Sequence, residues 1–197
     1  MSKMHQEGVT LIELLVTLSV VSMIIAVGVP ALRDFIAMNQ MSATVNDLVT
    51  SLHVARSEAI KRETSVRLCP STNWNSLMPT CTPLASLAEG WIVVADPNGD
   101  AIVVQRHEPL PGRIQLHRDF IDSIDFLANG RLPRIADAEI EFNLLLCDDR
   151  GDHNTGGDIA AGRWINIRGT GRPRIYTKRP DVQTALGGCL AHYGPIQ

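Results

Sequence analysis

The sequence lacks the short motifs that mark the common catalytic and metal sites. None of its four cysteines belongs to a CxxC pair, its six histidines include no HExxH motif, and no GxSxG nucleophile motif is present. These absences argue against a zinc ribbon, a thioredoxin-like redox centre, a histidine-based metal site and a hydrolase of the GxSxG type. We therefore expect no enzymatic activity, no cofactor and no metal ion.

Internal repeats and low-complexity tracts are also missing. Outside an apolar N-terminal segment, the 197 residues leave room for one globular domain of ordinary size. The net charge of −3 alone implies no polyanionic partner, but the charges are unevenly distributed. Residues 137–158 contain seven acids and one base, whereas residues 163–179 contain six basic residues and no acid. This segregation indicates a partner more strongly than the net charge does.

Charged residues are absent from the 19 positions from Leu14 to Leu32. A helix of that length can cross a bilayer, which takes about 20 residues. The run is not followed by the small-residue cleavage site of a secretory signal, and the polar leader before it ends at Gly8. Glu13 stands near the start of the apolar segment, where a carboxylate is costly in lipid and indicates a function.

Helical spacing continues beyond the apolar run. Apolar residues recur every three or four positions and define one face: Met41, Val45, Leu48, Leu52, Ala55 and Ala59. We predict one long helix over residues 10–62, in which Glu58 and Arg62 pair at i,i+4. Pro30, close to Gly28, is expected to bend or locally open it.

Residues beyond Glu63 show short β-like runs separated by turn signals. Turns are expected at residues 96–100 and at Asn129-Gly130, and loops at residues 71–86 and 148–162. The predicted strands are 66–69, 90–95, 101–106, 113–116, 124–126, 140–146, 164–167 and 174–176. The expected fold class is therefore α+β, a long N-terminal helix packed on an antiparallel β-sheet domain.

The four cysteines are Cys69, Cys81, Cys147 and Cys189. An even number behind a membrane segment fits two disulfides in an oxidising compartment, and four buried free thiols are the alternative. Three pairings are possible. We favour Cys69–Cys81 with Cys147–Cys189, because the first pair brackets a loop rich in Pro, Ser, Thr and Asn that needs a crosslink.

The segment GVTLIELLVTLSVVSMIIAVGVP, residues 8–30, resembles the N-terminus of a type IV prepilin. The resemblance implies that prepilin peptidase cuts after Gly8 and methylates the new N-terminal residue Val9, where the family prefers Phe. It also implies that Glu13 pairs with the N-terminal amine of a neighbouring subunit in the filament. Pro30 matches the family's helix-breaking proline.

This resemblance also implies an organisation and a location. Residues 1–8 would be the leader peptide, residues 9–36 a transmembrane and filament-core helix, and residues 37–197 a periplasmic or extracellular pilin domain. The protein would cross the inner membrane once and then assemble with other major and minor pilins into an extracellular type IV pilus.

Two further blocks resemble the FimT/GspH branch of minor pilins and pseudopilins. They are NDLVTSLHVARSEAIKRETSVRLCPS, residues 46–71, and GWIVVADPNGD, residues 90–100. The resemblance implies a type IV pilin-like fold, which agrees with the α+β architecture predicted above from periodicity.

The basic window contains GTGRPR, residues 169–174. Glycines let a backbone approach a ligand closely, and Arg172 and Arg174 flank Pro173, so both can point the same way in an extended run. The planar fork of arginine suits phosphate oxygens. A solvated turn whose charges aid solubility is the alternative interpretation.

The same segment resembles the GRxR motif of FimT-type minor pilins that bind DNA in natural transformation. The resemblance implies sequence-independent contacts to the phosphate backbone, because phosphates carry no sequence information. The implied DNA-binding residues are Gly171, Arg172 and Arg174, in a patch widened by Arg168, Lys178 and Arg179. Arg131 and Arg163 would contribute only if the fold brings them there, and Tyr176 is a candidate for stacking on a base.

Three functions follow in order of preference. The first is a FimT-like minor pilin that binds extracellular DNA for uptake. The second is a GspH-like pseudopilin of type II secretion, and the third is a structural minor pilin that primes pilus assembly. The GRPR motif within the basic window favours the first.

Overall fold

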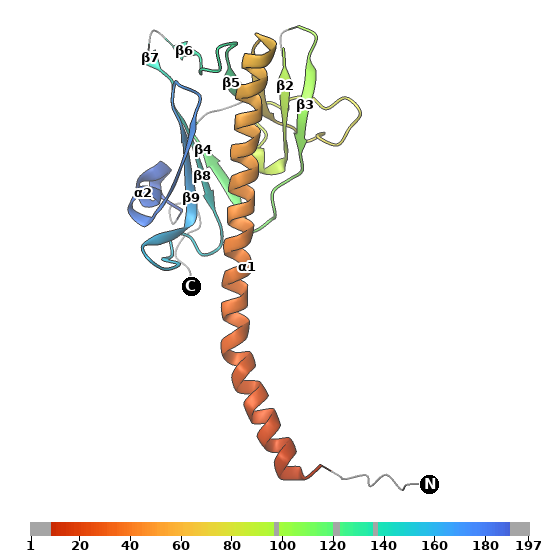
Figure 1. Cartoon of the computed structure of the whole chain (residues 1–197), viewed down its shortest axis with the longest axis vertical. Coiled ribbons are helices and arrows are strands. Elements are labelled where there is room, and N and C mark those ends of the chain that lie inside the picture. The colour runs from red at the N-terminus through yellow and green to blue at the C-terminus, as the bar shows by residue number, and fades with distance from the viewer. Residues whose placement is uncertain (1–8, 97–98, 120–122, 136–137, 190–197) are drawn as a thin grey trace. The chain divides into compact units, whose positions relative to one another are not determined.

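The computed structural model describes residues 9–96, 99–119, 123–135 and 138–189 (Figure 1). Its first helix, α1 (Leu11–Arg62), has 52 residues and begins one residue later than predicted. The helical backbone continues through Pro30, so this proline does not open the helix. Chain contacts divide the protein after Asn39 into two compact units.

The first unit contains the apolar beginning of α1. Its leucine, valine and isoleucine side chains are exposed on all sides from Leu11 to Leu32. Among the helices of the described residues, α1 is long and apolar enough, by length and composition, to cross a membrane. Such a surface needs lipid or other apolar helices to cover it.

The second unit, from Gln40, contains two four-stranded antiparallel sheets and a short hairpin. The first sheet has the order β3-β2-β1-β5, with β1 (Val66–Pro70), β2 (Trp91–Ala95), β3 (Ile102–His107) and β5 (Ile124–Phe126). The second has the order β10-β9-β8-β4, with β4 (Gln115–Arg118), β8 (Phe142–Cys147), β9 (Ile159–Ile167) and β10 (Pro173–Lys178). The remaining elements are the hairpin β6 (Arg134–Ile135) and β7 (Ala138–Glu139), the helix α2 (Arg179–Thr184), and the 3-10 turns η1 (Leu87–Glu89) and η2 (Ala185–Gly187).

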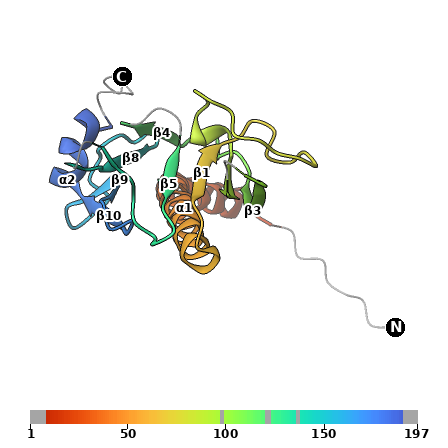
Figure 2. The same ribbon diagram turned by 90° about the horizontal axis from the view of Figure 1, so that it is seen from above.

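The predicted apolar face of α1 is the centre of the core. Its six residues, from Met41 to Ala59, are at most 3% exposed and belong to one hydrophobic cluster with residues of both sheets. Burying each large aliphatic side chain contributes about 1.5–3 kcal/mol relative to leaving it exposed. The indole Nε1 of Trp91 also donates to Ser51 Oγ at 3.0 Å, which satisfies a polar group inside this core. In Figures 1 and 2 this part of α1 lies against both sheets, with β2 and β3 on one side of it and β8 and β9 on the other.

All eight predicted strands are present, with their ends shifted by a few residues. The hairpin of β2 and β3 forms as expected, although residues 97 and 98 of its turn lie outside the described residues. The predicted ion pair also forms, since Arg62 Nε lies 2.5 Å from Glu58 Oε2 and lowers the pKa of that carboxyl.

The predicted loop 148–162 is wrong at its end, because β9 already begins at Ile159. Ala160, Ala161 and Gly162 carry no large or β-branched side chain, and so they show little strand signal. The lack of a side chain at Gly162 fits its position beneath a disulfide, since a Cβ there would lie 2.6 Å from Cys189 Sγ. The hairpin of β6 and β7 and the helix α2 were not predicted either.

The disulfides are Cys69–Cys81 and Cys147–Cys189, which is the pairing that the sequence favoured. The first closes a 12-residue separation around the loop after β1. The second spans 42 residues and joins β8 to the segment after η2. It belongs to a small hydrophobic cluster with Leu145, Ala160 and Val182, so it fastens α2 to the outer side of the second sheet.

Candidate functional site

The segment GTGRPR connects β9 to β10 at the edge of the second sheet. β9 ends at Ile167 and β10 begins at Pro173, and β10 pairs with β9 alone among the described strands. The N–H of Gly171 donates to Arg168 O at 2.7 Å and closes the turn between them. Arg172 and Arg174 therefore stand where the turn enters the edge strand, and both side chains are exposed.

Two glycines with positive φ bring three distant chain segments together at this turn. Gly171 has φ 68°, and a Cβ at this position would clash with the carbonyl oxygen of Gly130. Gly130 has φ 71°, and a Cβ there would lie 2.6 Å from Cδ1 of Ile60 on α1. The predicted turn at Asn129-Gly130 is thus held between α1 and the β9–β10 connection, with glycine favoured at both positions by the positive φ and, at Gly171, by the backbone oxygen that a Cβ would meet.

Five residues from these three segments line one open hollow of about 390 Å³. We call it the arginine hollow, and its lining residues are Arg56, Arg131, Thr170, Arg172 and Arg174. Both arginines of GRPR belong to it, in agreement with the expectation that they point the same way. Arg56 on α1 was not identified from the sequence, and Arg131 was expected to contribute only if the fold brought it there.

The charges of the hollow are only partly compensated. Arg131 NH2 lies 2.8 Å from Oε1 of Glu139 on β7, which neutralises one of the four cations. Arg56 Nε donates to the carbonyl of Gly130 at 3.0 Å, a contact that fixes the guanidinium without cancelling its charge. Within the part of the chain that the structure describes, the side chains of Arg172 and Arg174 form neither an ion pair nor a hydrogen bond. The hollow therefore presents an excess of positive charge suited to an anion.

The other predicted basic residues lie outside the hollow. Lys178 is four positions beyond Arg174 along β10, which corresponds to about 13 Å in an extended strand, and Arg179 begins α2. Arg168 stands before the turn, where its Nε lies 3.2 Å from Oε1 of Glu141. The predicted patch is thus divided into a compact arginine hollow and more distant single charges.

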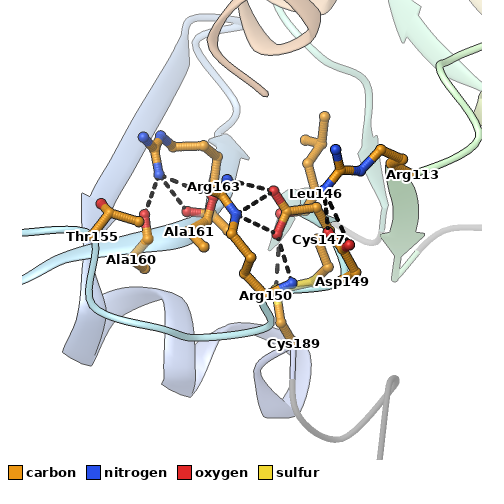
Figure 3. Close-up of polar contacts among 12 residues, drawn as sticks. Arg113, Leu146, Cys147, Asp149, Arg150, Thr155, Ala160, Ala161, Arg163 and Cys189 are labelled. Atoms are coloured by element: carbon orange, nitrogen blue, oxygen red, sulfur yellow. Dashed lines mark hydrogen bonds and ion pairs between the residues drawn. A yellow bond between two sulfur atoms is a disulfide. The ribbon is translucent and has the colours of Figure 1, made fainter. Parts of the chain in front are cut away.

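Arg163 is buried, and its side chain binds the protein's own backbone. The residue is 8% exposed, and its side chain donates to the carbonyl oxygens of Ala160 and Ala161, which Figure 3 labels, and to that of Gly162. Burial lowers the pKa of Arg163, and the nearby charge of Arg150 lowers it further, against a smaller opposite effect of Asp148.

The ring of Tyr176 already has a stacking partner. It stacks on Trp164 with ring centroids 4.2 Å apart. The indole of Trp164 in turn donates to Asn143 Oδ1 at 3.0 Å, which ties this aromatic pair to β8. Tyr176 is therefore a packed strand residue, with one face of its ring covered by Trp164.

The predicted N-terminal residues are partly visible in the structure. Gly8 lies outside the described residues. Val9 is exposed, and Glu13 lies in the first turn of α1, where its N–H donates to Thr10 Oγ1 at 3.3 Å. The Glu13 side chain is exposed among exposed apolar neighbours. Its proposed pairing requires a second subunit and stays a prediction.

Two family models match different parts of the chain. The family described as type II transport protein GspH matches residues 44–171, and the prokaryotic N-terminal methylation motif matches residues 3–29. No curated protein sequence gives a significant match. The GspH match includes Arg56, Gly130 and Arg131 but ends at Gly171, directly before Arg172.

Two crystal structures of the type IV minor pilin FimU from Pseudomonas aeruginosa are similar in fold. The first has 20% sequence identity and a TM-score of 0.50, covering 70% of this chain and 89% of that chain. The second has 18% identity and a TM-score of 0.48, covering 68% and 91%. The first comparison shows the type IV pilin fold.

Gly171→Ala tests the close approach that builds the hollow. We expect a loss of at least about 1 kcal/mol in the free energy of unfolding, because alanine is strained at positive φ and its Cβ meets the Gly130 carbonyl. Denaturant unfolding followed by circular dichroism would measure it. Gly112→Ala is the control, since a Cβ there has no neighbour within 4 Å. Equal stabilities for the two variants would contradict this packing.

Proposed function

Because the chain belongs to the GspH family of type IV pilin-like proteins, we propose that it is a minor pilin that binds extracellular DNA through the arginine hollow for uptake in natural transformation. The observation that carries the proposal is the convergence of four arginines on one hollow, two of them without a partner among the described residues. Guanidinium groups bind phosphate oxygens through short, charge-assisted hydrogen bonds.

The expected binding mode follows from the chemistry of the site. Contacts to phosphates carry no sequence information, so DNA of any sequence is a ligand. A few such contacts give a dissociation constant of about 10⁻⁴ to 10⁻⁶ M for one subunit and a strong dependence on salt. Several subunits on one filament raise the avidity without any new contact.

Assembly is the second part of the proposal. The beginning of α1 is the single span that holds the protein in the inner membrane, with the second unit in the periplasm. Prepilin peptidase cuts after Gly8 and methylates Val9, and the mature chain then joins other major and minor pilins in the pilus. Glu13 pairs there with the N-terminal amine of a neighbour, which offsets the cost of burying its carboxylate.

A pseudopilin of type II secretion is the second candidate. The description of the matching family as a type II transport protein favours it, as does the end of that match before Arg172. A structural minor pilin without a ligand is the third candidate. Neither of these two functions requires the charge of Arg172 and Arg174.

Arg172→Ala/Arg174→Ala tests DNA binding. We expect the double variant to bind random-sequence duplex DNA at least about tenfold more weakly, because it loses two charge-assisted contacts. Fluorescence anisotropy with the full-length protein in neutral detergent, at about 50 and 200 mM salt, would measure this.

Lys178→Ala/Arg179→Ala is the matched control, because it removes the same charge at the other end of β10. We expect a loss of about two- to threefold from long-range attraction alone. Equal losses for the two double variants would remove the hollow as the site. Wild-type protein that binds no DNA at about 50 mM salt would favour the pseudopilin.

Glu13→Ala tests assembly. We expect leader cleavage to be intact and incorporation into sheared pili to fall strongly, because the variant lacks the carboxylate that pairs with the neighbouring amine. Mass spectrometry of the mature N-terminus and immunoblots of the pilus fraction would measure the two steps. Asp34→Ala, which removes a carboxylate farther along α1, is the control. Normal incorporation of Glu13→Ala would refute this role.

A further inference from the structure

Glu139 lies beside the arginine hollow, in contact with its lining residue Arg131 and close to Gly169, which precedes its lining residue Thr170. Oε1 lies 2.8 Å from Arg131 NH2. The carboxyl also covers Gly169, since a Cβ on that glycine would lie 2.7 Å from Cδ and 2.9 Å from Oε2 of Glu139. An internal anion therefore sits directly beside the loop that carries Arg172 and Arg174.

The carboxylate is held weakly enough to be replaced. The side chains of Glu139 and Arg131 are 51% and 49% exposed, so their ion pair lies largely in water. Ion pairs of this kind contribute little, because solvent screens them and two long side chains must be ordered. A phosphodiester offers the same anionic oxygens to the guanidinium fork of Arg131 and can also reach the unpartnered Arg172 and Arg174.

Arg56 is prepared for a ligand in a different way. Its Nε donates to Gly130 O at 3.0 Å, and the side chain is half-buried between α1 and the 127–132 turn. This hydrogen bond restricts the side chain before binding, so less conformational entropy is lost when a ligand binds. The bond uses only Nε, so both terminal nitrogens of this hollow-lining residue have no hydrogen bond to the described residues.

We propose that a DNA phosphate enters the arginine hollow by displacing the Glu139 carboxylate from Arg131, and that Arg56 of α1 is a direct ligand of this phosphate. Glu139 is thus a built-in competitor that keeps the affinity of a single subunit low. This inference rests on the proposed DNA-binding function and adds two residues that lie outside the GRPR motif.

Glu139→Gln tests the competition through a gain in affinity, which a damaged fold would not produce. We expect duplex DNA to bind about two- to fivefold more tightly, because the variant lacks the competing ion pair. The measurement is anisotropy with full-length protein in neutral detergent at about 50 mM salt. Glu108→Gln is the control for net charge, since it removes an exposed carboxylate next to β3 on the other sheet.

The two carboxylate variants also separate this inference from the proposed function. In an Arg131→Gln background, Glu139→Gln should change the affinity no more than Glu108→Gln does, because the pair no longer exists. Wild-type binding with equal effects of Glu139→Gln and Glu108→Gln would overturn the competition and leave the DNA-binding function intact. Wild-type protein without DNA binding would overturn both.

Arg56→Gln tests whether Arg56 contacts the phosphate, through the salt dependence of DNA binding. The plot of log K against log salt has a negative slope, and each phosphate contact that is lost should reduce the magnitude of this slope by about 0.9. We expect this reduction for Arg56→Gln and an unchanged slope for Arg62→Gln, which removes a cation from the last turn of the same helix. An unchanged slope for Arg56→Gln would remove Arg56 from the phosphate ligands.

Discussion

The buried face of α1 from Met41 to Ala59 is the contact on which the rest of the second unit depends. The two four-stranded sheets are separate in strand pairing, and the hydrophobic cluster that connects them includes every residue of this face. Each sheet alone would expose an apolar side, and the shared helix covers both. The arginine hollow depends on the same packing, because Arg56 and Ile60 lie on α1 and meet the turn at Gly130.

The hollow shows how a fold can hold like charges together. Four guanidinium groups repel one another, and the open position of the hollow lets water screen that repulsion. Backbone contacts at Gly130 and Gly171 hold the segments in place, so the arginines need no mutual attraction to converge. A bound phosphate would relieve the repulsion, and part of its binding free energy would come from that relief.

Local patterns predicted the elements, and tertiary packing determined the site. The buried face of α1 could be predicted because its period of three to four residues is a local property of the sequence. Arg172 and Arg174 could be predicted to lie close together because they share one short motif. Arg56 could not be predicted, since in the sequence it resembles the other cations on the polar side of the helix. Its hydrogen bond to Gly130, 74 positions away, and its place in the lining of the hollow distinguish it. The start of β9 was missed for a similar reason. Gly162 gives no strand signal in the sequence, and the disulfide that leaves no room for a side chain there involves the distant Cys189.

The family match covers the residues that shape the hollow but not the two arginines of the GRPR motif. Arg56, Gly130, Arg131 and Gly171 lie inside the matched region, whereas Arg172 and Arg174 lie beyond it. The scaffold packs α1 against the 127–132 turn, and this packing stabilises the fold without any ligand. The two outer arginines lack a described partner and contribute no such packing. A fold alone does not determine function, so the proposal of DNA binding rather than a role in secretion depends on these two side chains.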